Sequence, residues 1–249
     1  MHGAEEGISV SLKSDILFNI LGFPVTNSFI TSLLLSFLLI FFVVFIIKKS
    51  NLRPSKLQLI IEFFIAGGYE FTKQTLGSEK LTKKVYPVIA SLFFVILFFN
   101  LTKFIPGMES IKFDGQHLFK PVHSDLNMTL ALSIVSWIVI QGMGILILGF
   151  WKYGSKFIQP KLLWGFLPII NPLGVLELIS EVAKVVSLSF RLFVNILVGG
   201  ILIMLLQELS HFMLPVIAML FEVFVAFLQA GVFALLTLFY IKLATDEPH

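Results

Sequence analysis

The sequence contains no cysteine, which excludes disulfides, thiolate metal sites and cysteine nucleophiles. Charge is also scarce, because Asp, Glu, Lys and Arg make up 13% of the residues, against roughly 25% in an average soluble domain. The formal net charge is only +3 and most basic residues stand in separate loops, so we expect no nucleic-acid partner. No HExxH motif occurs, and we expect neither a metal ion nor a cofactor.

Apolar residues, by contrast, are abundant, at 57% of the chain and with 28 phenylalanines. A helix needs roughly 20 such residues to cross about 30 Å of hydrocarbon. The sequence therefore predicts an all-α membrane protein, a single membrane domain with about five transmembrane helices. The five apolar runs of sufficient length are 28–47, 85–102, 126–150, 173–207 and 212–242.

Basic residues are distributed unevenly between the two sides of these spans. Eight lie between the first and second spans and three between the third and fourth. The outer loops and the N-terminal segment 1–27 hold only Lys13, Lys103, Lys112 and Lys120. Because loops rich in Lys and Arg stay in the cytoplasm, we expect the N-terminus outside and the C-terminus inside. The first residues, MHGAEEG, are acidic and lack the positive n-region of a secretory signal, so we expect no cleaved leader.

The segment 54–76, which reads PSKLQLIIEFFIAGGYEFTKQTL, mixes apolar residues with charged ones such as Glu62 and Lys73. It starts with a proline, which suits the first turn of a helix. An amphipathic helix of this kind lies in the membrane interface rather than across it. We expect it at the inner surface.

The last two runs are longer than a bilayer requires. At 1.5 Å per residue, helices over 173–207 and 212–242 would measure about 52 and 46 Å. Neither has a proline in its middle, since Pro215 falls in a first turn, where proline is tolerated. The sequence predicts two long, strongly tilted helices joined as a hairpin.

Polar residues are regularly spaced in this hairpin. Arg191 is the most costly, because an arginine at the centre of a lipid-facing helix costs about 2.5 to 3.5 kcal/mol. Ser187 and Asn195 lie one turn to either side of it on the same face. Such a charge inside a membrane span indicates an ion or substrate pathway. Further polar residues follow at spacings of seven: Glu177 and Lys184 precede Arg191 on the same predicted helix, and Glu222 and Gln229 lie on the next one.

Some of these charges have a simpler interpretation as helix-packing ion pairs. For Glu181 and Lys184 a packing role is favoured, because the two are three residues apart on one helix. For Glu222 a packing role and a pathway role both stay open.

The segments ELISEVAKVVSLSFRLFVNILVGG and FEVFVAFLQAGVFALLTLFYI resemble the signature of subunit a of F-type ATP synthases. Supporting matches are NLTKFIPG at the end of the second span and SDLNMTLAL at the start of the third. The resemblance covers about 85–245, and the N-terminal third fits by topology alone. It implies a stator subunit that is not catalytic by itself but is essential to the proton-transporting complex.

The resemblance implies that the long hairpin lies against a rotating ring of c subunits, with Arg191 facing the ring carboxylate. Further implied partners are the b-type peripheral stalk, the remainder of the F-type complex, the lipid bilayer and protons. Two half-channels would lead to the ring, and Asp125 has an N-cap role as an alternative. The inner path would contain Glu177, Ser180 and Ser187, and the outer path Asn195, Glu222, Gln229, Asn100 and Asp125.

Gly200 departs from the pattern of many members of that family, which carry a titratable residue at this position. We therefore expect Glu222 to be the sole titratable group of its kind on the outer path. A bacterial plasma (inner) membrane is favoured over the mitochondrial inner membrane.

Two other classes of function fit the sequence less well. A stand-alone secondary transporter could use Arg191 to bind an anionic solute, but the chain has no inverted repeat and no paired broken helices. An intramembrane hydrolase would need a nucleophile–base pair or a metal set, and none is present.

Overall fold

A computed structural model describes residues 16–20, 23–49, 55–105, 112–113, 116–117, 121–154, 172–210 and 213–245. The first 15 residues of the predicted outer segment 1–27 lie outside this part. The described chain is almost entirely helical, and five of its helices are long and apolar enough to cross a membrane. The predicted all-α membrane fold is confirmed.

Helices make up most of the described chain, and the strands in it are few and short. The strands among the described residues form two short antiparallel pairs, which the sequence did not predict. The strand bounds are β1 Ile16–Ile20, β2 Phe23–Thr26, β3 Lys112–Phe113 and β4 Gln116–His117. The helix bounds are α1 Asn27–Lys49, α2 Lys56–Leu76, α3 Glu79–Leu101, η1 Thr102–Phe104, η3 Val122–Ser124, α4 Leu126–Leu148, α5 Phe150–Gly154, α6 Pro172–Leu209 and α7 Met213–Thr245.

Local chemistry explains where several helices begin and end. The Ser55 side chain accepts a hydrogen bond from Gln58 N and caps α2, which ends at Gly77 with φ 67°. Helix α3 starts at Glu79, six residues before the apolar run, and its polar first turns carry an exposed Glu79–Lys83 ion pair of 3.0 Å. Helix α4 ends before Gly149, whose φ is 82°, so it is slightly shorter than predicted.

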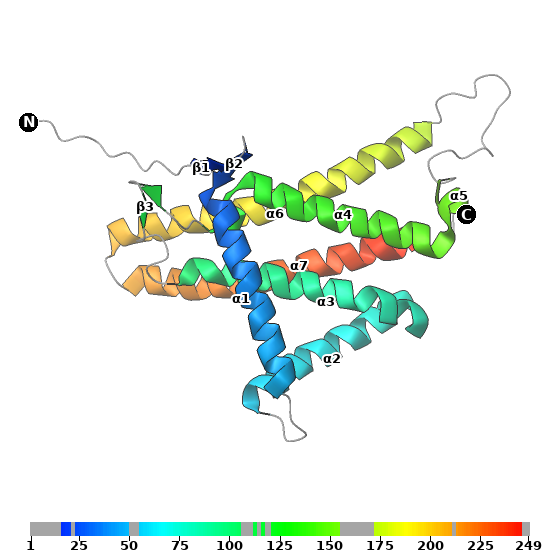
Figure 1. Cartoon of the computed structure of the whole chain (residues 1–249), viewed down its shortest axis with the longest axis horizontal. Coiled ribbons are helices and arrows are strands. Elements are labelled where there is room, and N and C mark those ends of the chain that lie inside the picture. The colour runs from blue at the N-terminus through cyan, green and yellow to red at the C-terminus, as the bar shows by residue number, and fades with distance from the viewer. Residues whose placement is uncertain are drawn as a thin grey trace, which may run out of the picture.

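Four helices form the body of the protein. Helices α3, α4, α6 and α7 run alongside one another, with contacts of α3 to α7 and of α4 to both α6 and α7 (Figure 1). Helix α1 crosses this group at a steep angle, and α2 diverges from its lower side. At 1.5 Å per residue, the 38 residues of α6 and the 33 of α7 give about 57 and 50 Å of helix.

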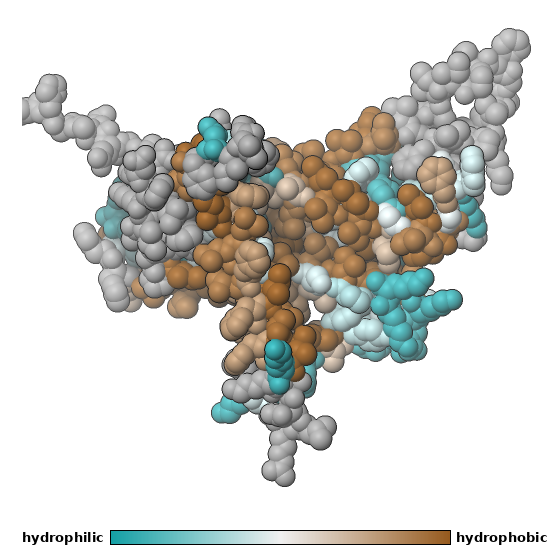
Figure 2. Space-filling view, in the orientation of Figure 1, coloured by the Kyte–Doolittle hydropathy of each residue, from teal (hydrophilic) through white to brown (hydrophobic). Residues whose placement is uncertain are grey.

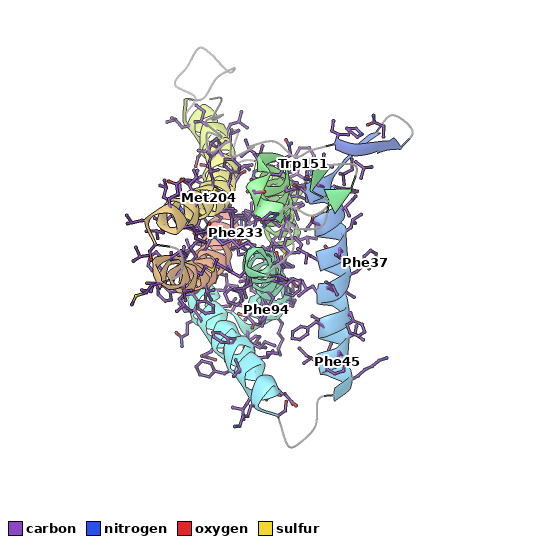
Figure 3. The ribbon with its side chains drawn as sticks, turned by 90° about the vertical axis from the view of Figure 1, so that its left-hand side faces the viewer. Phe37, Phe45, Phe94, Trp151, Met204 and Phe233 are labelled. Atoms are coloured by element: carbon purple, nitrogen blue, oxygen red, sulfur yellow. The ribbon has the colours of Figure 1, made fainter. Side chains whose placement is uncertain are left out.

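The core lies between the four bundle helices. Phe233 of α7 is fully buried and points into the bundle (Figure 3), where it packs with Leu92, Ile96, Leu188 and Leu192. A row of buried alanines on α7, including Ala226, Ala230 and Ala234, brings the neighbouring helices close. The bundle is thus tight enough to hold polar side chains in defined positions.

The outer surface is apolar over most of its visible area, as expected where lipid replaces water (Figure 2). On α1, Phe37 is 69% exposed and points away from the bundle (Figure 3). Hydrophilic residues gather at the connection of α2 and α3. The place of α2 at the inner membrane surface stays a prediction.

Candidate functional site

Arg191 lies near the middle of α6, at the edge of the helix face that packs on the bundle. Its side chain is half-buried, whereas the neighbouring Leu188 and Leu192 are buried. Among the described residues Arg191 has no hydrogen-bond or ion-pair partner. A permanent charge inside a membrane span is therefore left without a counter-charge from the described chain.

The polar stripe around Arg191 runs along the same edge of α6. Ser187 is exposed one turn before it, and Asn195 is half-buried one turn after it. Toward the N-terminus of α6, Ser180 is exposed and Glu177 is half-buried. The stripe thus faces partly outward from the bundle.

Glu222 of α7 is buried inside the bundle, with 5% of its surface exposed. Its Oε2 forms an ion pair with Lys103 Nζ, which comes from η1 after α3. The carboxylate fits against Gly199 of α6, where a Cβ atom would lie only 2.6 Å from Glu222 Cδ. Three elements therefore meet at this carboxylate.

Gly200, singled out from the sequence, has a different position. A Cβ built there meets no atom within 4 Å, so Gly200 adjoins open space and Gly199 adjoins Glu222. The two glycines differ by 100° around α6. The close approach to the outer carboxylate is thus a property of Gly199.

Asn100 is buried one turn before Lys103 and bonds to a second buried side chain. His123 Nδ1 donates to Asn100 Oδ1 over 2.6 Å, since that oxygen can only accept. His123 lies in η3, before the third membrane span, and burial lowers its pKa to about 4. The imidazole is neutral at physiological pH.

Two buried amides of this region have a free N–H group. Asn100 Nδ2 and Gln229 Nε2 have no hydrogen-bond partner in the described part of the chain. Neither carboxylate oxygen of Glu222 has one there either, apart from the ion pair of Oε2 with Lys103. Buried polar atoms of native proteins are nearly always paired, with protein or with ordered water. Asn100 lies three residues before Lys103, and Gln229 lies seven residues after Glu222 along α7, and each amide leaves an N–H group that an ordered water could bond.

Asp125 acts as the N-cap of α4, the alternative considered from the sequence. Its carboxylate accepts a hydrogen bond of 2.9 Å from Asn127 N, and its residue surface is 4% exposed. Nearby, Thr129 Oγ1 and Ser189 Oγ lie 3.1 Å apart and join α4 to α6.

Glu181 organises a second polar cluster, nearer the start of α6. Its carboxylate accepts hydrogen bonds from Trp137 Nε1 at 3.0 Å and Gln141 Nε2 at 2.7 Å and pairs with Lys184 Nζ at 2.5 Å. Tyr153 donates to Gln141, and burial, with smaller contributions from Glu181 and Glu177, raises the pKa of Tyr153 to about 12. The partners of the Glu181 carboxylate come from α4 and from α6 itself.

Lys103, His123 and Gly199 were not among the residues selected from the sequence. Lys103 was counted there only as an outer loop charge. The available signal was its spacing of three residues from Asn100 at the end of an apolar run, which puts both on one face of a helix. Lys103 forms an ion pair with Glu222, and Asn100 precedes Lys103 by three residues at the end of α3. Arg191 forms no hydrogen bond or ion pair with any of these three residues.

An apolar helical bundle with an unpaired arginine and a buried, incompletely bonded carboxylate has the features of a membrane protein that moves ions. A family model described as ATP synthase A chain matches residues 29–242. The chain therefore belongs to this family, which provides the proton-translocating membrane subunit of F-type ATP synthases.

Curated relatives named ATP synthase subunit a support this assignment. The protein of Campylobacter concisus is 36% identical over 193 residues, which are 78% of each chain. One from Campylobacter jejuni is 35% identical over 204 residues, 81% of this chain and 83% of the relative. That of Campylobacter hominis is 33% identical over 244 residues, 96% of this chain and all of the relative.

Proposed function

We propose that this subunit carries protons to and from a rotating ring of c subunits through two half-channels, which Arg191 keeps apart. The observation that carries the proposal is the absence of a partner for Arg191 among the described residues. A guanidinium ion inside a membrane span needs an anion, and a carboxylate on a neighbouring subunit would supply one. Assembly would then complete the ion pair.

Arginine is suited to this position because it stays protonated at every accessible pH. It cannot relay a proton. It favours the ionised form of a ring carboxylate, so a protonated carboxylate that arrives beside it must release its proton. The same fixed charge repels protons that would pass directly from one half-channel to the other.

The outer half-channel would run through the bundle beside Glu222. Support comes from the burial of Glu222 and from the free N–H groups of Asn100 and Gln229, which water can bond. Asn195 would link this region to Arg191. Asp125 caps α4 in the structure, and it would contribute to the outer half-channel from the edge of the path.

The inner half-channel would follow the outward edge of α6. Glu177 is half-buried there, and Ser180 and Ser187 are exposed. In the assembled complex this edge would face the ring across a narrow hydrated gap. Membrane voltage would drive the protons, at about 2.3 kcal/mol per charge for each 100 mV.

The remaining partners would be the b-type peripheral stalk and the other subunits of the complex. The distribution of basic residues supports an N-terminus outside and a C-terminus in the cytoplasm. The Campylobacter relatives support a bacterial plasma membrane.

The test is Arg191→Ala in the complete enzyme. We expect loss of ATP-driven acidification of inverted vesicles and loss of proton-driven ATP synthesis, while the subunit still inserts and assembles. Arg191→Lys should retain little activity, because an ammonium ion loses its charge more readily when buried and lacks the fork of donors.

The matched control is Val198→Ala, which shortens an exposed side chain two turns further along the same side of α6. It removes surface without removing charge and should pump at close to the normal rate. Normal pumping by Arg191→Ala would contradict the proposed role of the charge.

A further inference from the structure

The Lys103–Glu222 ion pair is buried, and its two partners come from different parts of the chain. The side chain of Lys103 is 11% exposed and that of Glu222 is 6% exposed. Lys103 Nζ also lies 5.0 Å from the centre of the Phe104 ring. Because removing charges from water is costly, a buried pair of this kind is weak support for stability and needs another explanation.

The carboxylate is held on one side only. Oε2 has the Lys103 ammonium, whereas Oε1 has no hydrogen-bond donor among the described residues. Gly199 leaves just enough room for the group, since any Cβ there would overlap it. A pair that served packing alone would be expected to satisfy both oxygens, as the Glu181 carboxylate does.

No other charged group of the described chain pairs with Glu222. The elements in contact with α7 are α2, α3, α4 and α6. The described titratable or charged groups on these elements, on α7 itself and on the neighbouring η3 and the α4 cap are Lys56, Glu62, Tyr69, Glu70, Lys73, Glu79, Lys80, Lys83, Lys84, Tyr86, His123, Asp125, Glu177, Glu181, Lys184, Arg191, Glu208, Tyr240 and Lys242. None of them forms an ion pair or hydrogen bond with its carboxylate. Lys103 is therefore the group whose charge acts most directly on this carboxylate.

We propose that Lys103 is a positioning residue of the outer proton path, whose ammonium ion keeps Glu222 ionised and seated against Gly199 until a proton arrives. The inference rests on the proposed place of Glu222 in that path. The incoming proton adds to a carboxylate oxygen, Lys103 keeps its own proton, and the attraction between the two side chains is lost. The neutral carboxyl group is then free to turn away, and release of the proton restores the pair.

The experiment measures proton-driven ATP synthesis by the complete enzyme in proteoliposomes at constant voltage. The pH is varied on the side of the outer channel mouth. In Lys103→Met, Glu222 loses the charge that favours its ionised form, so the half-maximal point should move to higher pH by about 1 to 3 units. The maximal rate should also fall, because the carboxyl group without the neighbouring ammonium ion releases its proton more slowly.

Two control variants separate charge from structure. Lys103→Arg keeps the positive charge and should keep the profile near its original pH. Lys83→Met makes the same substitution in an exposed pair, Lys83 with Glu79, and should leave both rate and profile unchanged. Should Lys103→Met fail to assemble, Lys103→Gln is read in the same way, since it keeps an N–H donor without the charge.

Failure of this inference can be told apart from failure of the proposed path. If the half-maximal point of the pH profile stays at the original pH in Lys103→Met, or in Lys103→Gln, then Lys103 only stabilises the structure. If Glu222→Gln by itself synthesises ATP at the normal rate, the outer path does not use Glu222 and the proposed path is wrong. The double variant Lys103→Met with Glu222→Gln should show no change beyond that of Glu222→Gln.

Discussion

At the scale of single residues, adjacent positions with the same side chain have different roles. Gly199 and Gly200 are neighbours on α6, yet only Gly199 adjoins a carboxylate. The cause is the 100° turn between successive residues of a helix, which points one position at α7 and the next at open space. The function of such a residue is set by what faces it.

This difference predicts the outcome of a matched pair of substitutions. Gly199→Ala would push a methyl group into the Glu222 carboxylate, which must shift or break its ion pair. Overpacking of this kind costs about 1 to 3 kcal/mol. Gly200→Ala adds the same methyl group where no atom lies within 4 Å.

We expect Gly199→Ala to slow proton-driven synthesis and to lower the thermal midpoint of the purified complex, with Gly200→Ala close to normal in both. Both substitutions raise helix propensity alike, so the comparison isolates the contact with Glu222. Equal behaviour of the two variants would contradict this account of the carboxylate's position.

At the scale of the element, α6 carries two faces with different tasks. One face holds buried apolar residues such as Leu188, Leu192 and Ile196, which anchor it to α3, α4 and α7. The other holds the half-buried Arg191 with exposed neighbours such as Ser187 and Val194. The helix therefore presents its charge at the edge of an otherwise apolar outer surface.

The proposed position of the ring predicts which side of α6 can be cross-linked to it. The natural chain has no cysteine, so single cysteines can be introduced without further changes. Ser187→Cys and Val194→Cys should form disulfides with a cysteine placed beside the ring carboxylate. Leu188→Cys and Leu192→Cys point into the bundle and should react poorly, and the reverse pattern would refute the facing of α6.

At the scale of the whole molecule, polar groups are divided between the surface ends and a few buried clusters. Hydrophilic residues gather at the connection of α2 and α3 (Figure 2), whereas the sides of the helices are largely apolar. This is the arrangement expected of a protein surrounded by lipid with its ends in water. It also separates the ends of the bundle that would face opposite sides of the membrane.

The predicted orientation can be tested with two equivalent substitutions. Ser78→Cys lies between α2 and α3, and Ser210→Cys follows the end of α6. A maleimide that does not cross membranes should label Ser78→Cys in inverted vesicles and Ser210→Cys in intact cells. The opposite pattern would place the N-terminus inside and exchange the two proposed half-channels.

Much of the architecture could be predicted because it depends on local sequence. Long apolar runs specify membrane helices wherever they occur, since an unpaired backbone cannot remain in lipid. Each of the five predicted runs corresponds to a helix in the structure, with differences at the ends. The start of α3 was missed because its first turns are polar and carry no hydrophobic signal.

The sequence by itself determined the helical fold, the five apolar spans and the presence of Arg191 within an apolar run. Each of these depends only on the composition of a continuous stretch. Tertiary structure alone decided that Lys103 meets Glu222, that Gly199 rather than Gly200 makes room for the carboxylate, and that His123 bonds to Asn100. These contacts join residues from separate helices. Their pairing depends on how whole helices are rotated and packed, and many small apolar contacts together determine that packing. No local sequence pattern predicts it.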